Sequence, residues 1–154
     1  LKEVKDANVQ FIWQTGKYYN AEMNKAVSDF GEIPNLKVLD FITDMGAAYN
    51  AADLVISRAG ASSISEFCLI GKPVILVPSP NVAEDHQTKN AMALVDKDAA
   101  VYVKDSEAPE MLLKRALEIV NDNAKLESLS TNIKKLGLPN SADVIADEVL
   151  KLVR

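Results

Sequence analysis

Residues 57–66 combine the residue types that can bind a phosphorylated ligand. They read Ser-Arg-Ala-Gly-Ala-Ser-Ser-Ile-Ser-Glu and lie between the apolar runs 54–56 and 67–70. This order predicts a buried strand, a turn of small residues and the start of a helix that Gly71 ends. The first N–H groups of a helix carry partial positive charge, and small side chains leave them accessible to a phosphate. Glu66 follows Ser63 by three residues, where its carboxylate can accept hydrogen bonds from a neutral diol such as ribose.

Two interpretations of this helix start remain open from the residues alone. In the first, Gly60 lets the chain turn sharply, and Ser63 offers its hydroxyl and its N–H to an anion. In the second, Ser63 and Glu66 form a capping box in which each side chain bonds the other residue's backbone N–H. The pattern Ser-x-x-Glu is common by chance, so this segment does not decide between them.

A second polar segment begins at Pro78 and leads into a helix from Asp85 onward. Gln87 offers both a hydrogen-bond donor and an acceptor, which suits the hydroxyls of a sugar. His86 is the only histidine, and a general base is one interpretation of it. The other is a loop-end residue bonded to the backbone, with Asp85 as the N-cap, and the absence of a neighbouring nucleophile favours this second interpretation.

The composition indicates one soluble globular domain and disfavours several functions. The net charge is −5 over 154 residues, and no basic run is present, so nucleic acid is not an expected partner. A single cysteine, Cys68, cannot form an internal disulfide and is interpreted as a small core residue of a protein in a reducing cytoplasm. No second histidine, cysteine pair or carboxylate set has the spacing of metal ligands, so no metal or other cofactor is predicted.

Apolar runs alternate with helical patterns along the chain. The expected strands are residues 9–13, 36–39, 54–56, 73–77 and 100–103. The expected helices are residues 18–29, a short one capped by Thr43 or Asp44, 61–70, one starting near 85, one opened by Ala108 and Pro109, one near 126–136, and one capped by Asn140 or Ser141. Such alternation predicts a Rossmann-like, doubly wound parallel sheet, in which Phe11 and Trp13 are expected in the core.

Ligands of doubly wound sheets bind beyond the carboxyl ends of the strands. The loops that leave these ends are residues 14–17, 40–44, 57–63 and 78–87. We therefore expect the four loops to converge on one crevice. The fold alone does not identify the ligand.

Several motifs, in order, resemble the bacterial peptidoglycan N-acetylglucosaminyltransferase family. The motifs are Trp13-Gln14-Thr15-Gly16, Phe41-Ile42-Thr43-Asp44-Met45, Ala52 to Ala61, Ser65-Glu66, Gly71-Lys72-Pro73, Val77-Pro78, Asp85-His86-Gln87 and Asn90-Ala91. Together they cover nearly the whole chain. The resemblance implies one half of a two-domain GT-B glycosyltransferase, namely the C-terminal domain that holds the donor, UDP-N-acetylglucosamine.

The resemblance also implies a role for each matching position. The backbone around Ile42 would hold the uracil, and Glu66 would accept from the ribose hydroxyls. Gln87 and His86 would hold the N-acetylglucosamine hydroxyls. The diphosphate would lie at the helix start, whose residues are Ala61, Ser62, Ser63, Ile64 and Ser65.

In this family, a glycine-rich loop and an N-terminal domain precede the part that the chain resembles. The opening residues 1–5 read as a helix without an N-cap, so we expect a fragment of a longer protein. The missing domain would carry the catalytic base and the contacts to the acceptor, undecaprenyl-diphospho-N-acetylmuramoyl-pentapeptide. The resemblance therefore implies no catalytic residue in this chain, no turnover by the chain alone, and a full-length protein on the cytoplasmic face of the bacterial inner membrane.

The implied reaction is an inverting transfer in which the acceptor hydroxyl attacks the anomeric carbon from the face opposite UDP. Two other functions stay open. A UDP-N-acetylglucosamine 2-epimerase has a similar two-domain fold but needs acid and base groups near the sugar, for which only His86 and nearby carboxylates are available. The second alternative is a non-catalytic module that binds a nucleotide sugar. An assay with the lipid-linked acceptor would distinguish it from a transferase.

Overall fold

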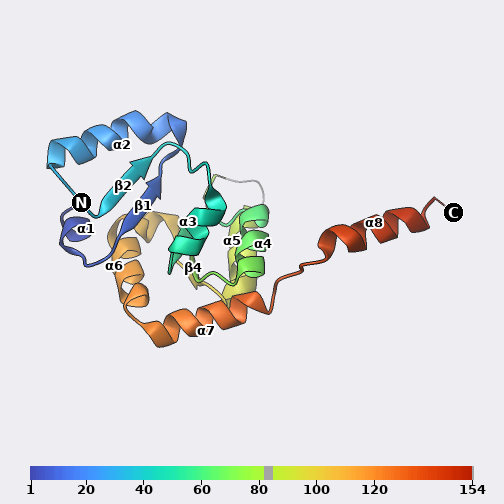
Figure 1. The fold of residues 1–154 in the computed structure, drawn as a ribbon. Helices are drawn as coiled ribbons and strands as arrows, with labels where there is room; N and C mark the ends of the chain where they lie inside the picture. Colours follow the sequence, from blue (N-terminus) through green and yellow to red (C-terminus); the bar gives the residue numbers. More distant parts are fainter. Residues whose placement is uncertain (82–84, 154) are drawn as a thin grey trace. The chain divides into compact units, whose positions relative to one another are not determined.

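The computed structural model describes residues 1–81 and 85–153. The chain divides into two compact units, residues 1–52 and 53–154. Both units contain parallel strands joined through helices, as Figure 1 shows. The expected α/β class with parallel strands is confirmed, although the described strands form two sheets, ordered β1-β2 and β3-β4-β5.

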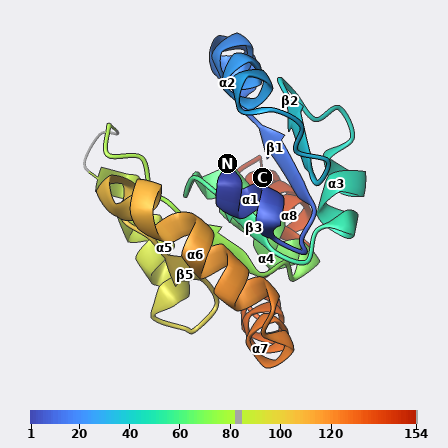
Figure 2. The same cartoon turned by 90° about the vertical axis from the view of Figure 1, so that its left-hand side faces the viewer.

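The first unit is built on the strand pair β1 (Phe11–Gln14) and β2 (Leu36–Leu39). Its helices are α1 (Lys2–Asp6), α2 (Gly16–Phe30) and α3 (Met45–Ala51). Gln14 pairs with Leu39 at the carboxyl ends of the two strands. Figures 1 and 2 show α2 alongside β2. The predicted strand 36–39 is therefore confirmed, and the predicted helix 18–29 begins two residues earlier than expected.

Side-chain hydrogen bonds fix the loops of this unit. Asn35 donates through Nδ2 to three carbonyl oxygens, those of Val4, Ala7 and Val9, at 2.7–3.0 Å. These bonds fasten the segment between α1 and β1. Asp44 is the N-cap of α3, and its carboxylate accepts from the N–H of Ala47 at 2.8 Å, so the predicted cap is confirmed.

The expected burial of Trp13 is wrong. Trp13 is 40% exposed, and Phe11 is only half-buried. The reason is that β1 has a single neighbouring strand, and three of its four residues are exposed. An apolar strand sequence indicates where a strand lies, but the layers that cover it decide whether its side chains are buried.

The second unit contains most of the buried hydrophobic residues. Its strands are β3 (Val55–Ser57), β4 (Val74–Leu76) and β5 (Val101–Tyr102), with β4 in the centre and fully buried. Its helices are α4 (Ala61–Ile70), α5 (His86–Val95), η2 (Asp105–Glu107), α6 (Ala108–Val120), α7 (Asn123–Lys134) and α8 (Ser141–Lys151). The core cluster joins β4 to helices α6 and α7 through Ile75, Val77, Val103, Ala116, Ile119 and Leu129.

Two glycines let α4 and α7 pack closely. Gly71 ends α4 in the left-handed region at φ 67°, as the sequence predicted, and its carbonyl accepts from the Ser130 hydroxyl at 2.7 Å. Gly137 follows α7, and a Cβ there would lie 2.9 Å from the carbonyl oxygen of Cys68. A side chain at Gly137 would therefore force the two helices apart.

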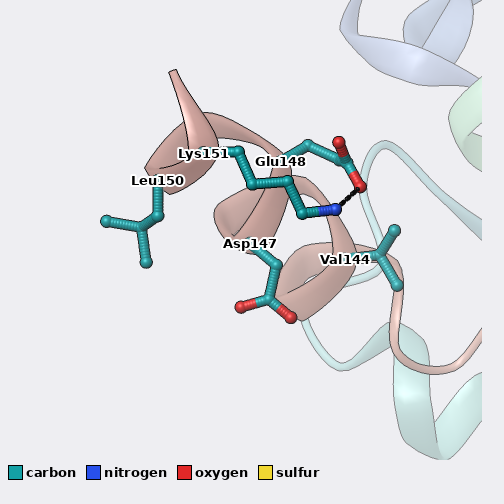
Figure 3. Close-up of a pocket in the computed structure, with 5 residues that line it drawn as sticks. All are labelled: Val144, Asp147, Glu148, Leu150 and Lys151. Atoms are coloured by element: carbon teal, nitrogen blue, oxygen red, sulfur yellow. Dashed lines mark hydrogen bonds and ion pairs between the residues drawn. The ribbon is translucent and has the colours of Figure 1, made fainter. Parts of the chain in front are cut away.

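The last helix, α8, has no buried residue. Its apolar residues Val144, Ile145 and Val149 are each more than half exposed. Figure 3 shows a pocket lined by α8 alone, in which Lys151 Nζ contacts Glu148 Oε1 at 2.6 Å. This pocket contains none of the predicted site residues. Among the described residues, no helix is long and apolar enough to cross a membrane.

Candidate functional site

The loops that follow β3 and β4 leave the same edge of the second sheet, because neighbouring parallel strands end at the same side. The first loop covers residues 58–60 and leads into α4. The second starts at Val77 and leads into α5, and its residues 82–84 lie outside the described part. The structure thus brings the predicted residues of α4 and α5 together in the second unit.

The start of α4 carries backbone N–H groups that the helix itself does not use. The helix begins at Ala61, with Gly60 as its N-cap, and its first internal bond runs from the N–H of Ile64 to the carbonyl of Gly60. No side chain of the described residues caps this end. The N–H groups of Ala61, Ser62 and Ser63 therefore form a positive helix terminus of small residues, of which Ala61 and Ser62 are exposed.

This geometry excludes one of the two interpretations of the helix start. A capping box requires Ser63 to be the N-cap, but Ser63 is the third residue of the helix. The capping-box interpretation is therefore wrong, since the helix begins two residues earlier than that pattern requires. The Ser65 hydroxyl donates to the carbonyl of Ala61 at 3.0 Å, within the first turn.

The expected role of Gly60 in a sharp turn is wrong as well. Its φ of −68° and ψ of 142° are open to any residue. A Cβ at Gly60 would meet nothing closer than the Ser63 Oγ, at 3.9 Å. Glycine is therefore not required by the backbone at this position. What it does is keep the space in front of the helix start open.

Glu66 lies on the exposed side of α4, one turn after Ser62 and Ser63. Its neighbours Phe67 and Cys68 are buried and fix the rotation of the helix. Ile64 is half-buried. The backbone of Glu66 is thus fixed about one helical turn, roughly 5 Å, beyond the open helix start.

Two side chains of α5 hold the residue that precedes this helix start. Gln87 Oε1 accepts from the N–H of Ala59 at 3.3 Å and from the N–H of Ser79 at 2.9 Å. Asn90 Nδ2 donates to the carbonyl of Ala59 at 3.2 Å. Ala59 itself is fully buried. Gln87 was expected to face a sugar with a donor and an acceptor, but backbone amides occupy its acceptor.

Arg58 links the same two loops through further hydrogen bonds. Its Nη1 donates to the carbonyls of Val77 and Pro78, at 3.2 and 3.3 Å, and forms an ion pair with Asp105 at the start of η2. The sequence placed Arg58 and Asn90 within motifs but gave them no role. The signal for Arg58 was a polar residue directly after an apolar strand, although the expected burial of this strand is wrong, since Ile56 is 44% exposed. The signal for Asn90 was a polar residue three positions after Gln87 in the same helix.

His86 is the first residue of α5 and is exposed. Asp85 is the N-cap, as one interpretation predicted, with φ of 52° in the left-handed region. Its carboxylate accepts from the Thr88 hydroxyl at 2.7 Å. The hydrogen bond between Asp85 and Thr88 thus closes a local turn that includes His86.

The predicted uracil contact, Ile42, belongs to the first unit and lies in the loop after β2. Its N–H donates to Gln14 Oε1 at 2.8 Å. Thr15 fastens the neighbouring strand end, because its N–H and hydroxyl both donate to the carbonyl of Leu39. The loop after β2 is therefore held by side chains from the end of β1, a contact between residues 28 apart that the sequence did not reveal.

Cys68 is buried in α4, as expected of a small core residue. Burial raises the pKa of its thiol, and the positive charge of Lys97 opposes this shift. Among the described residues, no group of three His, Cys, Asp or Glu side chains could hold a metal ion.

The fold defines the class of protein: a Rossmann-like α/β domain of the kind that forms one half of GT-B glycosyltransferases. MurG from Acinetobacter baumannii superposes with a TM-score of 0.83 at 28% identity, over 97% of this chain and 46% of that one. The glycosyltransferase of kitacinnamycin shares the fold, with a TM-score of 0.64 over 90% of this chain and 34% of that one, at 24% identity. The expected fold class is thereby confirmed.

The model of the glycosyltransferase family 28 C-terminal domain matches residues 1–145, and the chain belongs to this family. It is 67% identical over 153 residues to the UDP-N-acetylglucosamine--N-acetylmuramyl-(pentapeptide) pyrophosphoryl-undecaprenol N-acetylglucosamine transferase of Bacteroides thetaiotaomicron. That alignment covers 99% of the chain and 41% of the relative. The chain thus spans less than half the length of this relative, and the family resemblance seen in the sequence is confirmed.

Proposed function

We propose that the chain binds UDP-N-acetylglucosamine as the donor half of a glycosyltransferase of peptidoglycan synthesis. The open start of α4 carries this proposal, because no side chain caps its first N–H groups and the space at Gly60 is free as far as the Ser63 hydroxyl, one turn before Glu66. The membership in glycosyltransferase family 28 and the printed name of the Bacteroides relative support the choice of nucleotide sugar.

The diphosphate is proposed to lie at the start of α4. The N–H groups of Ala61, Ser62 and Ser63 and the Ser63 hydroxyl would donate to its oxygens, with Ile64 and Ser65 completing the first turn. A helix terminus provides these donors without rearrangement, and its partial charge stabilises the negative charge that develops on a departing diphosphate. We propose on this ground that the transfer needs no metal and no other cofactor.

The remaining parts of the donor are assigned to three further residues. Glu66 is proposed to accept hydrogen bonds from the two ribose hydroxyls, because its carboxylate is exposed a turn along from the phosphate donors. Gln87 would donate to the N-acetylglucosamine through Nε2, with His86 next to it. In the first unit, the backbone of Ile42 is proposed to contact the uracil.

The proposed reaction transfers N-acetylglucosamine with inversion to undecaprenyl-diphospho-N-acetylmuramoyl-pentapeptide. The acceptor hydroxyl attacks the anomeric carbon, the bond to the UDP oxygen breaks, and a base takes the proton of the attacking hydroxyl. We propose that this base and the acceptor contacts come from a part of the protein beyond this chain, where the contact to the cytoplasmic face of the inner membrane would also lie.

Calorimetric titration with UDP tests the assignment of Glu66. Glu66→Ala is expected to weaken UDP binding by about 1–3 kcal/mol, because hydroxyls that bonded a carboxylate lose a charged partner. The control is Glu127→Ala, which removes an exposed glutamate from α7 and is expected to leave the affinity unchanged. An unchanged affinity in Glu66→Ala would contradict the ribose contact.

Incubation with UDP-N-acetylglucosamine tests the reaction class. The chain with the lipid-linked acceptor is expected to bind the donor and to give no transfer product, whereas the full-length protein gives the disaccharide. Formation of an epimer of the sugar nucleotide would contradict the transferase proposal and favour the epimerase.

A further inference from the structure

Both hydrogen-bonding groups of the Ala59 backbone are held by side chains of α5. Gln87 Oε1 accepts from its N–H at 3.3 Å, and Asn90 Nδ2 donates to its carbonyl at 3.2 Å. Gln87 and Asn90 are three residues apart in a helix, so they lie on the same face. Ala59 is fully buried and directly precedes Gly60, the N-cap of α4.

Two backbone N–H groups donate to Gln87 and thereby fix the orientation of its side-chain amide. Ala59 and Ser79 both offer N–H groups, so the oxygen of the side chain must face them. A carbonyl oxygen has two lone pairs, and both are used by these bonds. Gln87 can therefore present only its Nε2 donors to a ligand, while its oxygen ties the loop after β3 to the loop after β4.

We infer that Gln87 and Asn90 are positioning residues that hold the start of α4 where it meets the diphosphate. Buried backbone groups left without partners are costly, so the loss of either side chain would let residues 59–60 shift toward other partners. The N–H groups of Ala61–Ser63 would shift with them. This inference rests on the proposed function, because it concerns the donors assigned to the diphosphate.

The inference makes a prediction that a sugar-contacting role alone does not make. UDP has no N-acetylglucosamine, so a Gln87 that only contacted the sugar would be irrelevant to UDP binding. If Gln87 positions α4, its loss changes the contribution that the diphosphate makes to binding. This contribution is measured as the ratio of UDP affinity to uridine affinity. General destabilisation would weaken both ligands and leave this ratio unchanged.

The experiment titrates UDP and uridine into the wild-type chain, Gln87→Met and Asn90→Ala, at a temperature where thermal unfolding shows each protein to be folded. Each variant is expected to lower the UDP-to-uridine affinity ratio about tenfold, the size of one lost charge-assisted hydrogen bond, and to leave uridine affinity within about twofold. The matched control is Thr88→Ala, which lies between the two residues and bonds only Asp85 among the described partners. This control should keep the wild-type ratio.

The possible outcomes separate the two claims. If both variants keep the wild-type ratio of UDP affinity to uridine affinity, the inference is overturned and the proposed function still stands. Equal loss of both ligands would also overturn it. A wild-type chain without any preference for UDP would overturn the proposed function and this inference together. If Gln87→Met does not fold, Asn90→Ala carries the same test through its separate bond to the Ala59 carbonyl.

Discussion

Gln14 Oε1 accepts a hydrogen bond from the N–H of Ile42 at 2.8 Å, across 28 residues of sequence. This bond joins the end of β1 to the loop after β2 and uses the backbone donor of Ile42. We propose that the carbonyl of Ile42, the backbone acceptor of the same residue, is the group that this loop offers to a base. A carbonyl selects a ring N–H.

Uracil has such an N–H at N3, whereas cytosine has an acceptor there. UDP is therefore expected to bind more tightly than CDP by about 1–3 kcal/mol, since two opposed acceptors leave the Ile42 carbonyl without a hydrogen-bond donor. Calorimetric titration with both nucleotides measures the difference. Equal affinities would show that the Ile42 carbonyl does not select the base.

The Gly60→Ala variant tests whether Gly60 is required for ligand binding but not for folding. Because φ is −68° and a Cβ would have free space, the free energy of unfolding is expected to change by less than about 0.5 kcal/mol. UDP affinity is expected to fall, since the added methyl group lies in front of the α4 start. Chemical denaturation and UDP titration give the two values, and an unchanged affinity would indicate that the diphosphate does not approach Gly60.

Gly71→Ala is the contrasting variant at the other end of α4. Gly71 has φ of 67°, and a Cβ there would lie 3.2 Å from the side chain of Lys134. The free energy of unfolding is expected to fall by about 1 kcal/mol, with UDP affinity unchanged in the folded protein. Stability equal to that of the wild type would contradict the left-handed cap.

Cys68 is expected to react slowly with thiol reagents. The thiolate is the reactive form, and burial raises the thiol pKa, so less thiolate is present at neutral pH than in an exposed cysteine. Alkylation by iodoacetamide, followed by mass spectrometry, should be slow in the folded chain and fast in denaturant. Its rate should rise as the pH is raised. Equal rates in the folded and unfolded chain would contradict the burial of Cys68.

The sequence was informative where the cause is local. Residues 36–39 are a strand as predicted, Asp44 caps α3, and Gly71 ends α4, because each depends on neighbours within a few positions. The helix start at Ala61 was placed correctly in outline, although the interpretation of Gly60 was wrong since its backbone is ordinary.

What the sequence did not reveal depends on contacts between distant residues. The bonds from Gln87 to Ala59 and from Gln14 to Ile42 each join residues 28 apart, and no local pattern marks them. The exposure of Trp13 likewise follows from the number of strands beside β1. Side chains that hold loops are therefore recognised only after the fold has placed their partners.

The central claim is that the start of α4 receives the diphosphate of a uridine nucleotide. Nuclear magnetic resonance of the isotope-labelled chain during titration with UDP tests it most directly. The backbone N–H resonances of Ala61, Ser62 and Ser63 are expected to shift strongly with UDP and weakly with uridine. Saturation of the protein by UDP with these three resonances unmoved would contradict the account.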